Sequence, residues 1–182
     1  MRAAAAEPTI DGHGFTVTLP AEWEGRIYQR PTPTTTFSPK NRAAVGGTGI
    51  NPGRAGSGWL GERTRPILHL GNFPLPVDRG DYGSGAVEIM GPADVFIAIL
   101  EFGPESLGTA LYSIVGLPRV SPDRFNPNGL QRRLPGQSGF QAFFTEQSRP
   151  MCLYVVLGEH RNVVALSATA NMMLDRIQVG AG

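Results

Sequence analysis

The chain has 182 residues, of which 41% are hydrophobic and 17% are charged, and its formal net charge is +1. This length predicts a single domain over residues 1–182. The nearly balanced charge argues against a dedicated nucleic-acid-binding protein, because such proteins gain much of their affinity by neutralising phosphates.

The N-terminal residues include one arginine, Arg2, and no apolar stretch long enough for a signal peptide. No apolar run in the sequence approaches the roughly 18–20 residues that a membrane-spanning helix requires. We therefore expect a cytoplasmic protein without a membrane span.

The first residues with a regular pattern predict a β-hairpin. Apolar and polar side chains alternate over 13–19 and again over 23–29, as they do in half-buried strands. Pro20 ends the first run, and residues 20–22 would form the connection between the two strands.

The segment 31–64 differs in composition from the rest of the chain. It contains seven glycines and four prolines but few large apolar side chains. Such a segment buries too little surface to offset the entropy lost on ordering, so we expect a flexible insertion between two strands. The alternative is a partner-binding loop closed by Trp59 and Leu60, since long loops often carry function.

Two later stretches, 94–102 and 150–157, are apolar on both faces. This pattern is typical of strands in the middle of a sheet that is covered on both sides. Other strands are expected at 66–73, 86–90 and 139–146. The two doubly apolar strands should therefore lie at the centre of the sheet.

Two helices are expected. A short one is predicted at 105–112, and a longer one begins after Asn162, where apolar residues recur at helical spacing. These apolar residues are Val163, Leu166, Ala170, Met173 and Ile177. Between the two helices, the segment 114–137 contains prolines too closely spaced for a long regular element.

The order of these elements predicts the fold class. Strands mostly follow strands instead of alternating with helices, which favours an antiparallel sheet. We expect an α+β fold, with an antiparallel sheet of about seven strands on which the C-terminal helix and the short middle helix pack. Its core should contain large apolar residues of the central strands and the last helix: Ile97, Ile99, Leu153, Val155, Leu157, Val163, Leu166 and Leu174.

Three side chains are candidates for catalysis. Glu101 ends an apolar strand, where a carboxylate should lie at the sheet edge or pair with an arginine; a structural ion pair is the simpler interpretation. Ser106 stands in a sequence close to a nucleophile elbow but with different spacing, and a place in the first turn of a helix is simpler. His69 alternates with Ile67, which predicts a half-buried strand residue.

The remaining candidates concern anions and metals. His160 and Arg161 precede the last helix, where the helix dipole favours a bound anion; a solvated turn is the alternative. The three histidines lack the spacing of metal ligands, so neither a metal site nor a cofactor is expected. Cys152 is the only cysteine, which excludes an intrachain disulfide, and its apolar strand predicts a buried, unreactive thiol.

The sequence Gly-Phe-Thr-Val-Thr-Leu-Pro-Ala-Glu-Trp at 14–23 is an amphipathic strand followed by Pro and Glu-Trp. With the strand hairpin, helix and short 174–179 segment at the end of the chain, it resembles PsbP-like proteins, the group that includes the Ran-binding Mog proteins. The resemblance implies an antiparallel sheet sandwiched by helices in a non-enzymatic binding or assembly module. It transfers no functional residue, and 31–64 and 114–137 depart from it. The chain also resembles small actinobacterial proteins of unassigned function.

These observations favour a non-catalytic protein-interaction or assembly module whose partner is another protein. The alternative is a small hydrolase or ligand-binding enzyme that uses Glu101, His69 or Ser106. A pocket that brings two of these side chains within hydrogen-bond reach would favour the enzyme, whereas an exposed apolar patch would favour the interaction module.

Overall fold

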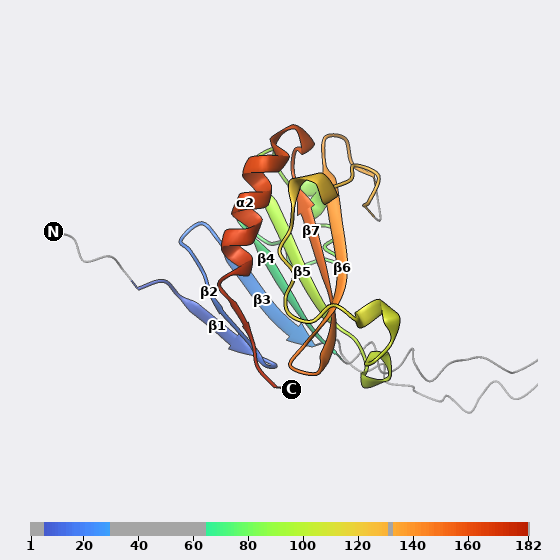
Figure 1. The fold of residues 1–182 in the computed structure, drawn as a ribbon. Coiled ribbons are helices and arrows are strands. Elements are labelled where there is room, and N and C mark those ends of the chain that lie inside the picture. The colour runs from blue at the N-terminus through green and yellow to red at the C-terminus, as the bar shows by residue number, and fades with distance from the viewer. Residues whose placement is uncertain (1–5, 30–64, 131–132, 182) are drawn as a thin grey trace, which may run out of the picture.

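A computed structural model describes residues 6–29, 65–130 and 133–181 (Figure 1). The insertion predicted at 31–64, with Trp59 and Leu60, lies outside the described residues. The described strands before and after it are close in space, because Gln29 and Pro66 are partners on adjacent antiparallel strands.

The larger of two sheets has five antiparallel strands in the order β3-β4-β5-β7-β6. Their bounds are β3 Glu24–Gln29, β4 Pro66–Gly71, β5 Val95–Glu101, β6 Ser138–Glu146 and β7 Arg149–Leu157. The inner strands β5 and β7 are buried along their length, apart from Glu101 at the end of β5, which is less completely buried than the other residues. The prediction that these two strands lie at the centre is therefore confirmed.

The smaller sheet has three antiparallel strands in the order β1-β2-β8. Its strands are β1 Thr9–Gly12, β2 Phe15–Thr18 and β8 Ile177–Val179. The N-terminal and C-terminal ends of the described chain thus meet in one sheet. The expectation of one sheet of about seven strands is wrong, because the strands divide into two sheets of three and five.

The predicted hairpin between 13–19 and 23–29 is also wrong. His13 and Gly14 have positive φ angles of 49° and 76°, so the chain reverses there and β2 pairs with β1. The backbone N–H of Trp23 donates to the carbonyl of Pro20 (2.9 Å), and this turn carries the chain from the smaller sheet to the larger.

One long helix, α2 (Val163–Leu174), leads from β7 back to β8 and confirms the predicted C-terminal helix. In Figure 1, α2 and the smaller sheet lie on the same side of the five-stranded sheet, which we call the α2 face. The predicted core is confirmed on this face. It includes buried residues of both sheets and of the helix, among them Phe15, Val17, Ile97, Ile99, Leu153, Val155, Leu157, Leu166, Leu174 and Ile177, with Val163 partly buried against them.

The opposite face of the five-stranded sheet is covered by the segment between β4 and β5. Phe73, Leu75, Ala86 and Val87 from this segment pack on Phe96, Ala98, Tyr154 and Val156 of the strands. The strand predicted at 86–90 is wrong, because Val87–Ile89 forms the 3-10 helix η1. The N–H groups of Ala86 and Val87 both donate to the carbonyl of Gly83, which keeps the chain coiled there.

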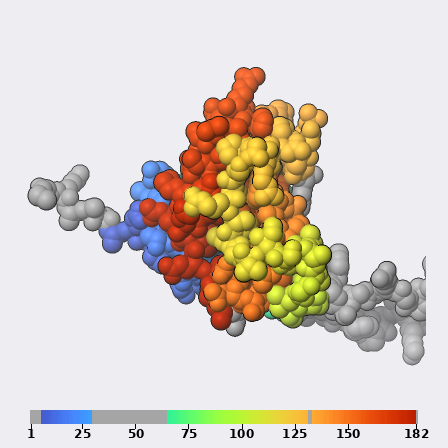
Figure 2. Space-filling model, viewed as in Figure 1, coloured from blue at the N-terminus to red at the C-terminus, as the bar shows by residue number. Residues whose placement is uncertain are grey.

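The prediction of one short helix at 105–112 is wrong, because this segment does not form a continuous helix. Two single 3-10 turns, η2 (Pro104–Ser106) and η3 (Ala110–Tyr112), stand in its place, and Gly108 between them has a φ of 76° that interrupts helical geometry. The segment 103–116 forms a yellow-green projection on the surface in Figure 2. Residues 114–137 contain only the 3-10 turn η4 (Pro122–Arg124) among their described residues, as their prolines predict.

Strands β6 and β7 form a hairpin with the two-residue turn Gln147-Ser148. Both residues have positive φ angles, 50° and 60°, and Glu146 pairs with Arg149 directly across the turn. Such a turn matches the twist of the flanking strands. It fixes the position of Arg149 at the first residue of β7.

A last 3-10 turn, η5 (His160–Asn162), precedes α2. No helix within the described ranges combines the length and apolar character that crossing a bilayer would require.

The core assignment is tested by Leu153→Ala. Leu153 is fully buried in β7, so the substitution should lower the free energy of unfolding by about 2–5 kcal/mol. Val164→Ala is the control, because Val164 is 70% exposed on α2 and its truncation should change stability by less than about 0.5 kcal/mol. Urea denaturation measures both; equal midpoints for Leu153→Ala and the wild type would contradict the position of β7.

Candidate functional site

The three residues predicted as catalytic candidates lie apart. Glu101 follows Ile97 and Ile99 on the α2 face, whereas His69 packs on the opposite face of the same sheet. Ser106 lies in η2, beyond the end of β5, and its N–H donates to the carbonyl of Gly103 in a first-turn bond. The five-stranded sheet therefore separates the acid from the histidine.

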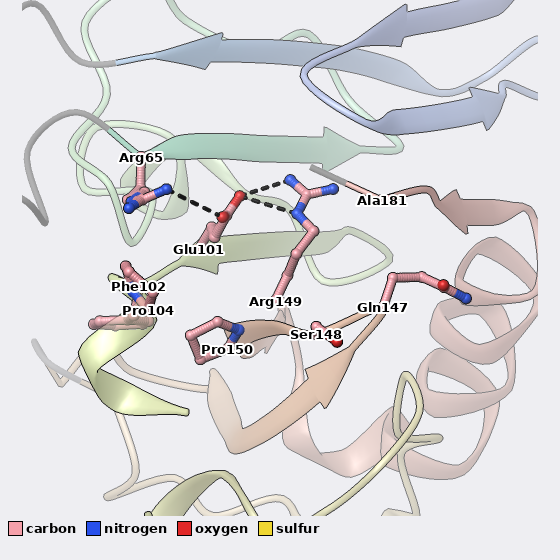
Figure 3. A pocket seen from close by; sticks show the side chains of 9 residues that line it. All are labelled: Arg65, Glu101, Phe102, Pro104, Gln147, Ser148, Arg149, Pro150 and Ala181. Atoms are coloured by element: carbon pink, nitrogen blue, oxygen red, sulfur yellow. Dashed lines mark hydrogen bonds and ion pairs between the residues drawn. The ribbon is translucent and has the colours of Figure 1, made fainter. Parts of the chain in front are cut away.

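Glu101 forms a buried ion pair with Arg149 (Figure 3). The Glu101 Oε2 atom accepts from Arg149 Nη2 at 2.6 Å and from Nε at 3.1 Å. Both side chains are almost completely buried. This is the structural ion pair with an arginine that the sequence indicated for Glu101. The sequence did not identify Arg149 as the partner, because the two residues are 48 positions apart and meet only through the pairing of β5 with β7.

Arg149 also joins the two sheets. Its Nη1 atom donates to the carbonyls of Gly180 (3.1 Å) and Gly14 (3.3 Å), and Nη2 donates to the carbonyl of His13 (2.8 Å). A guanidinium has five N–H donors, and with the two bonds to Glu101 all five have an acceptor. The guanidinium carbon also lies 4.9 Å from the centre of the Phe15 ring. Arg149 is therefore a structural side chain with no donor left for a ligand.

Two open clefts, with volumes of about 510 and 480 Å³, are lined by this ion pair. Arg65, Glu101, Arg149 and Ala181 line both. Phe102, Pro104, Gln147, Ser148 and Pro150 complete the first cleft, which Figure 3 shows, and His13, Gly14, Gln29 and Pro66 complete the second. Arg65 was not recognisable from the sequence, because it stands directly after the glycine-rich segment and belongs to no motif.

His69 is fully buried, and not half-buried as its alternation with Ile67 predicts. Its Nδ1 atom lies 2.9 Å from Arg79 Nε, and its Nε2 atom lies 2.7 Å from the carbonyl oxygen of Asp81. Because a guanidinium can only donate, Nδ1 accepts, and the neutral ring carries its proton on Nε2, which donates to Asp81. Burial lowers the pKa of His69 from 6.5 to about 4, the Asp81 carbonyl opposes this shift, and the Arg79 charge adds to it.

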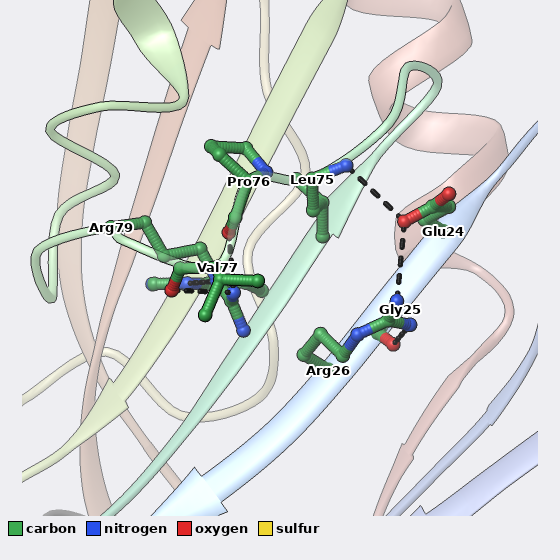
Figure 4. A network of polar contacts seen from close by, with 8 residues as sticks. Glu24, Gly25, Arg26, Leu75, Pro76, Val77 and Arg79 are labelled. Carbon is green, nitrogen blue, oxygen red and sulfur yellow. Dashed lines mark hydrogen bonds and ion pairs between the residues drawn. The ribbon is translucent and has the colours of Figure 1, made fainter.

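The same arginine holds the segment that follows β4. Arg79 Nη1 donates to the carbonyl of Pro76 (2.7 Å), and its guanidinium carbon lies 5.5 Å from the centre of the Tyr28 ring. Figure 4 shows Arg79 turned toward the backbone of Pro76 and Val77, and Glu24 accepting from the N–H of Leu75. Burial lowers the pKa of Arg79 below its ordinary value. His69 is thus a structural acceptor that anchors this loop to the sheet.

The remaining predicted residues are the anion-binding candidates His160 and Arg161 and the buried Cys152. Glu159 Oε1 accepts from the N–H of Arg161 (3.1 Å) at the start of η5, so an anion at His160 and Arg161 would compete with a carboxylate of the chain; anion binding there stays a prediction. Cys152 is buried and accepts from Gln141 Nε2 (3.3 Å), and burial raises its pKa to about 11. Its thiol is therefore protonated at neutral pH.

The clearest surface feature that the sequence analysis missed is apolar. Four large side chains of the segment 103–116 are exposed: Leu107 (36%), Leu111 (56%), Ile114 (45%) and Val115 (86%). We call these four residues the 107–115 patch. The sequence contains them as ordinary apolar residues, with no pattern that predicts their exposure.

Comparison of this chain with protein-family models, with curated proteins and with solved structures found no match. The resemblance to PsbP-like proteins therefore stays a prediction.

The buried, neutral His69 should make stability depend on pH. The folded pKa, about 4, is below the unfolded value of 6.5, so the unfolded chain binds the proton more readily and stability falls as the pH drops through this window. The His69 contribution to this loss should reach about 3 kcal/mol between pH 7 and pH 4. Urea unfolding at several pH values should show a shallower loss for His69→Gln than for the wild type, whereas His13→Gln, at an exposed turn, should follow the wild type.

The ion pair between Glu101 and Arg149 is tested by a double-mutant cycle. Arg149→Met leaves the Glu101 carboxylate buried without its close partner and should cost about 3–5 kcal/mol. The double variant Arg149→Met/Glu101→Met should be more stable than Arg149→Met alone, because no unpaired charge remains. Denaturation of the four proteins gives the coupling energy, and independent, additive costs would show that the pair does not act as one unit.

Proposed function

We propose that the protein is a non-catalytic protein-interaction or assembly module whose contact surface is the 107–115 patch. The proposal includes the PsbP-like architecture and the cytoplasmic location expected from the sequence. The single observation that carries it is the exposure of four large apolar side chains on one short segment. Exposed apolar groups gathered in one place are a mark of protein-binding surfaces.

The backbone beneath the patch is firmly held, which supports a binding role. Tyr112 packs its ring against Phe102 and Phe143, with centres 5.8 and 5.5 Å away. Thr145 on β6 donates its N–H to the carbonyl of Ile114 (2.7 Å) and its hydroxyl to the carbonyl of Tyr112 (2.8 Å). The N–H of Gly116 in turn donates to the carbonyl of Thr145 (2.9 Å). A surface that is already ordered loses less entropy when a partner binds.

The alternative function, a small hydrolase that uses Glu101, His69 or Ser106, has less support. Glu101 is paired with a buried arginine, His69 uses both ring nitrogens to anchor a loop, and the sheet lies between them. A general base must come within hydrogen-bond reach of its proton, directly or through one water. The ligand-binding form of the alternative has a separate basis in the clefts around Arg65.

Charge placed in the patch tests the proposal. Leu111→Asp and Val115→Asp should fold like the wild type, because both side chains are exposed, but should lose the partner, since an unpaired carboxylate would be buried in the interface. The matched control is Val164→Asp on α2, because the exposed fraction of Val164 (70%) lies between those of Leu111 (56%) and Val115 (86%). Affinity capture from a lysate of the native host, with quantitative mass spectrometry, should show at least one protein retained by the wild type and by Val164→Asp but reduced about tenfold or more by both patch variants.

Sedimentation velocity of the purified proteins completes the experiment, because it shows whether the captured partner is a second copy of the chain. The proposal fails if the wild type and both patch variants retain the same proteins and have the same sedimentation coefficients.

A further inference from the structure

Arg65 differs from its neighbour Arg149 in how its guanidinium is used. Arg149 has an acceptor for every N–H, whereas Arg65 Nε has no hydrogen-bond partner within the described ranges, although it is shielded from water. Arg65 Nη1 lies 3.8 Å from Glu101 Oε1, which is an ion-pair distance but too long for a hydrogen bond. About a third of the Arg65 side chain is exposed, and it lines both clefts. Among the described residues, Arg65 therefore lies beside two open spaces with its N–H donors largely unused.

The charges around the clefts favour one negative charge on a ligand. Arg65 and Arg149 supply two positive charges and Glu101 one negative charge, so the charged side chains that line each cleft sum to +1 with His13 neutral. A monocarboxylate balances this sum. A phosphate dianion would bring an additional negative charge close to Glu101, and like charges at such distances repel.

The walls of the first cleft indicate what else the ligand contains. Phe102, Pro104 and Pro150 contribute apolar surface beside the ion pair, and the turn residues Gln147 and Ser148 contribute polar groups (Figure 3). A volume of about 510 Å³ exceeds what a carboxylate alone would fill. A ligand with a short apolar group next to its carboxylate would use both kinds of wall.

From these features we infer that the first cleft is a binding site for a monocarboxylate with a short apolar group, and that Arg65 is the residue that recognises the carboxylate. The ligand supplies the acceptor that the guanidinium lacks, and a turn of the side chain that brings Nε into the cleft makes the contact bidentate. Arg149 and Glu101 hold the wall and set the local charge without contacting the carboxylate. The carboxylate belongs either to a free small acid or to the end of a peptide chain, since both present the same chemistry. This inference does not depend on the 107–115 patch.

The experiment titrates the full chain, labelled with ¹⁵N, with butyrate at constant ionic strength. Butyrate should shift the backbone amide signals of Phe102 and Ser148 and the Nε–H signal of Arg65. Arg65→Gln should weaken binding at least tenfold, because it removes the charged donor. Arg119→Gln, which removes an exposed arginine paired with Asp175 outside the clefts, and Leu111→Asp in the patch should both bind like the wild type.

Further ligands test separately the need for a negative charge, the need for an apolar group and the source of the carboxylate. Butyramide, which has no charge, should not bind, and acetate, which has no apolar group to fill the cleft, should bind several-fold more weakly than butyrate. An N-acetylated dipeptide with a free carboxyl end and its amidated form distinguish the two sources: binding of the free-carboxyl dipeptide tighter than butyrate assigns the site to a peptide end, and binding of butyrate alone assigns it to a small acid. Equal binding by Arg65→Gln and the wild type, or tighter binding of inorganic phosphate than of butyrate, would overturn the inference.

Discussion

The arrangement of the two sheets depends on one buried guanidinium. Arg149 begins β7 in the five-stranded sheet, yet three of its donors reach carbonyls of the smaller sheet's turn and of the chain just after β8. Taking a charged group out of water is costly, and Glu101 on the neighbouring strand offsets that cost. Since the acceptors come from the first and last parts of the described chain, the ion pair also determines where the N-terminal hairpin and the C-terminal strand meet. Glu101 and Arg149 also line both clefts, so the same ion pair forms part of their walls.

The two faces of the large sheet are covered by different parts of the chain. The α2 face is closed by a helix and a second sheet around an apolar core. The opposite face is closed by a loop. Hydrogen bonds of the neutral His69 side chain to Arg79 and to the carbonyl of Asp81 attach this loop to the sheet, in place of strand-to-strand backbone hydrogen bonds. Neither face leaves the central strands accessible. The two surface features with a proposed binding role lie elsewhere: the clefts at the ends of the strands, and the 107–115 patch beside the edge strand β6.

The sequence was a good guide wherever burial alone decides the structure. The continuous apolar runs of β5 and β7 can only lie inside a covered sheet, and the helical spacing after Asn162 requires one apolar face. It was a poor guide where the local structure depends on contacts between segments that are far apart in the sequence. Ile10 is the only large apolar residue of β1, so this strand is recognisable only once β2 pairs with it. Gly83 and its hydrogen bonds make 86–90 a turn, although its composition fits a strand. The same limit applies to the site, because Glu101 could be identified as a paired acid but its partner could not.

The pairing of Gln29 with Pro66 has a consequence for how this protein can change during evolution. The chain leaves the sheet after Gln29 and returns at its partner Pro66, so the points of exit and entry are set by the pairing of β3 with β4. Residues can be gained or lost between them without shifting the register of any strand. The connection is therefore a natural acceptor for whole inserted modules, and Arg65 stands at its border. Arg65 lines both clefts and belongs to the described chain, so the clefts keep their own residues and the scaffold stays the same when the connection varies.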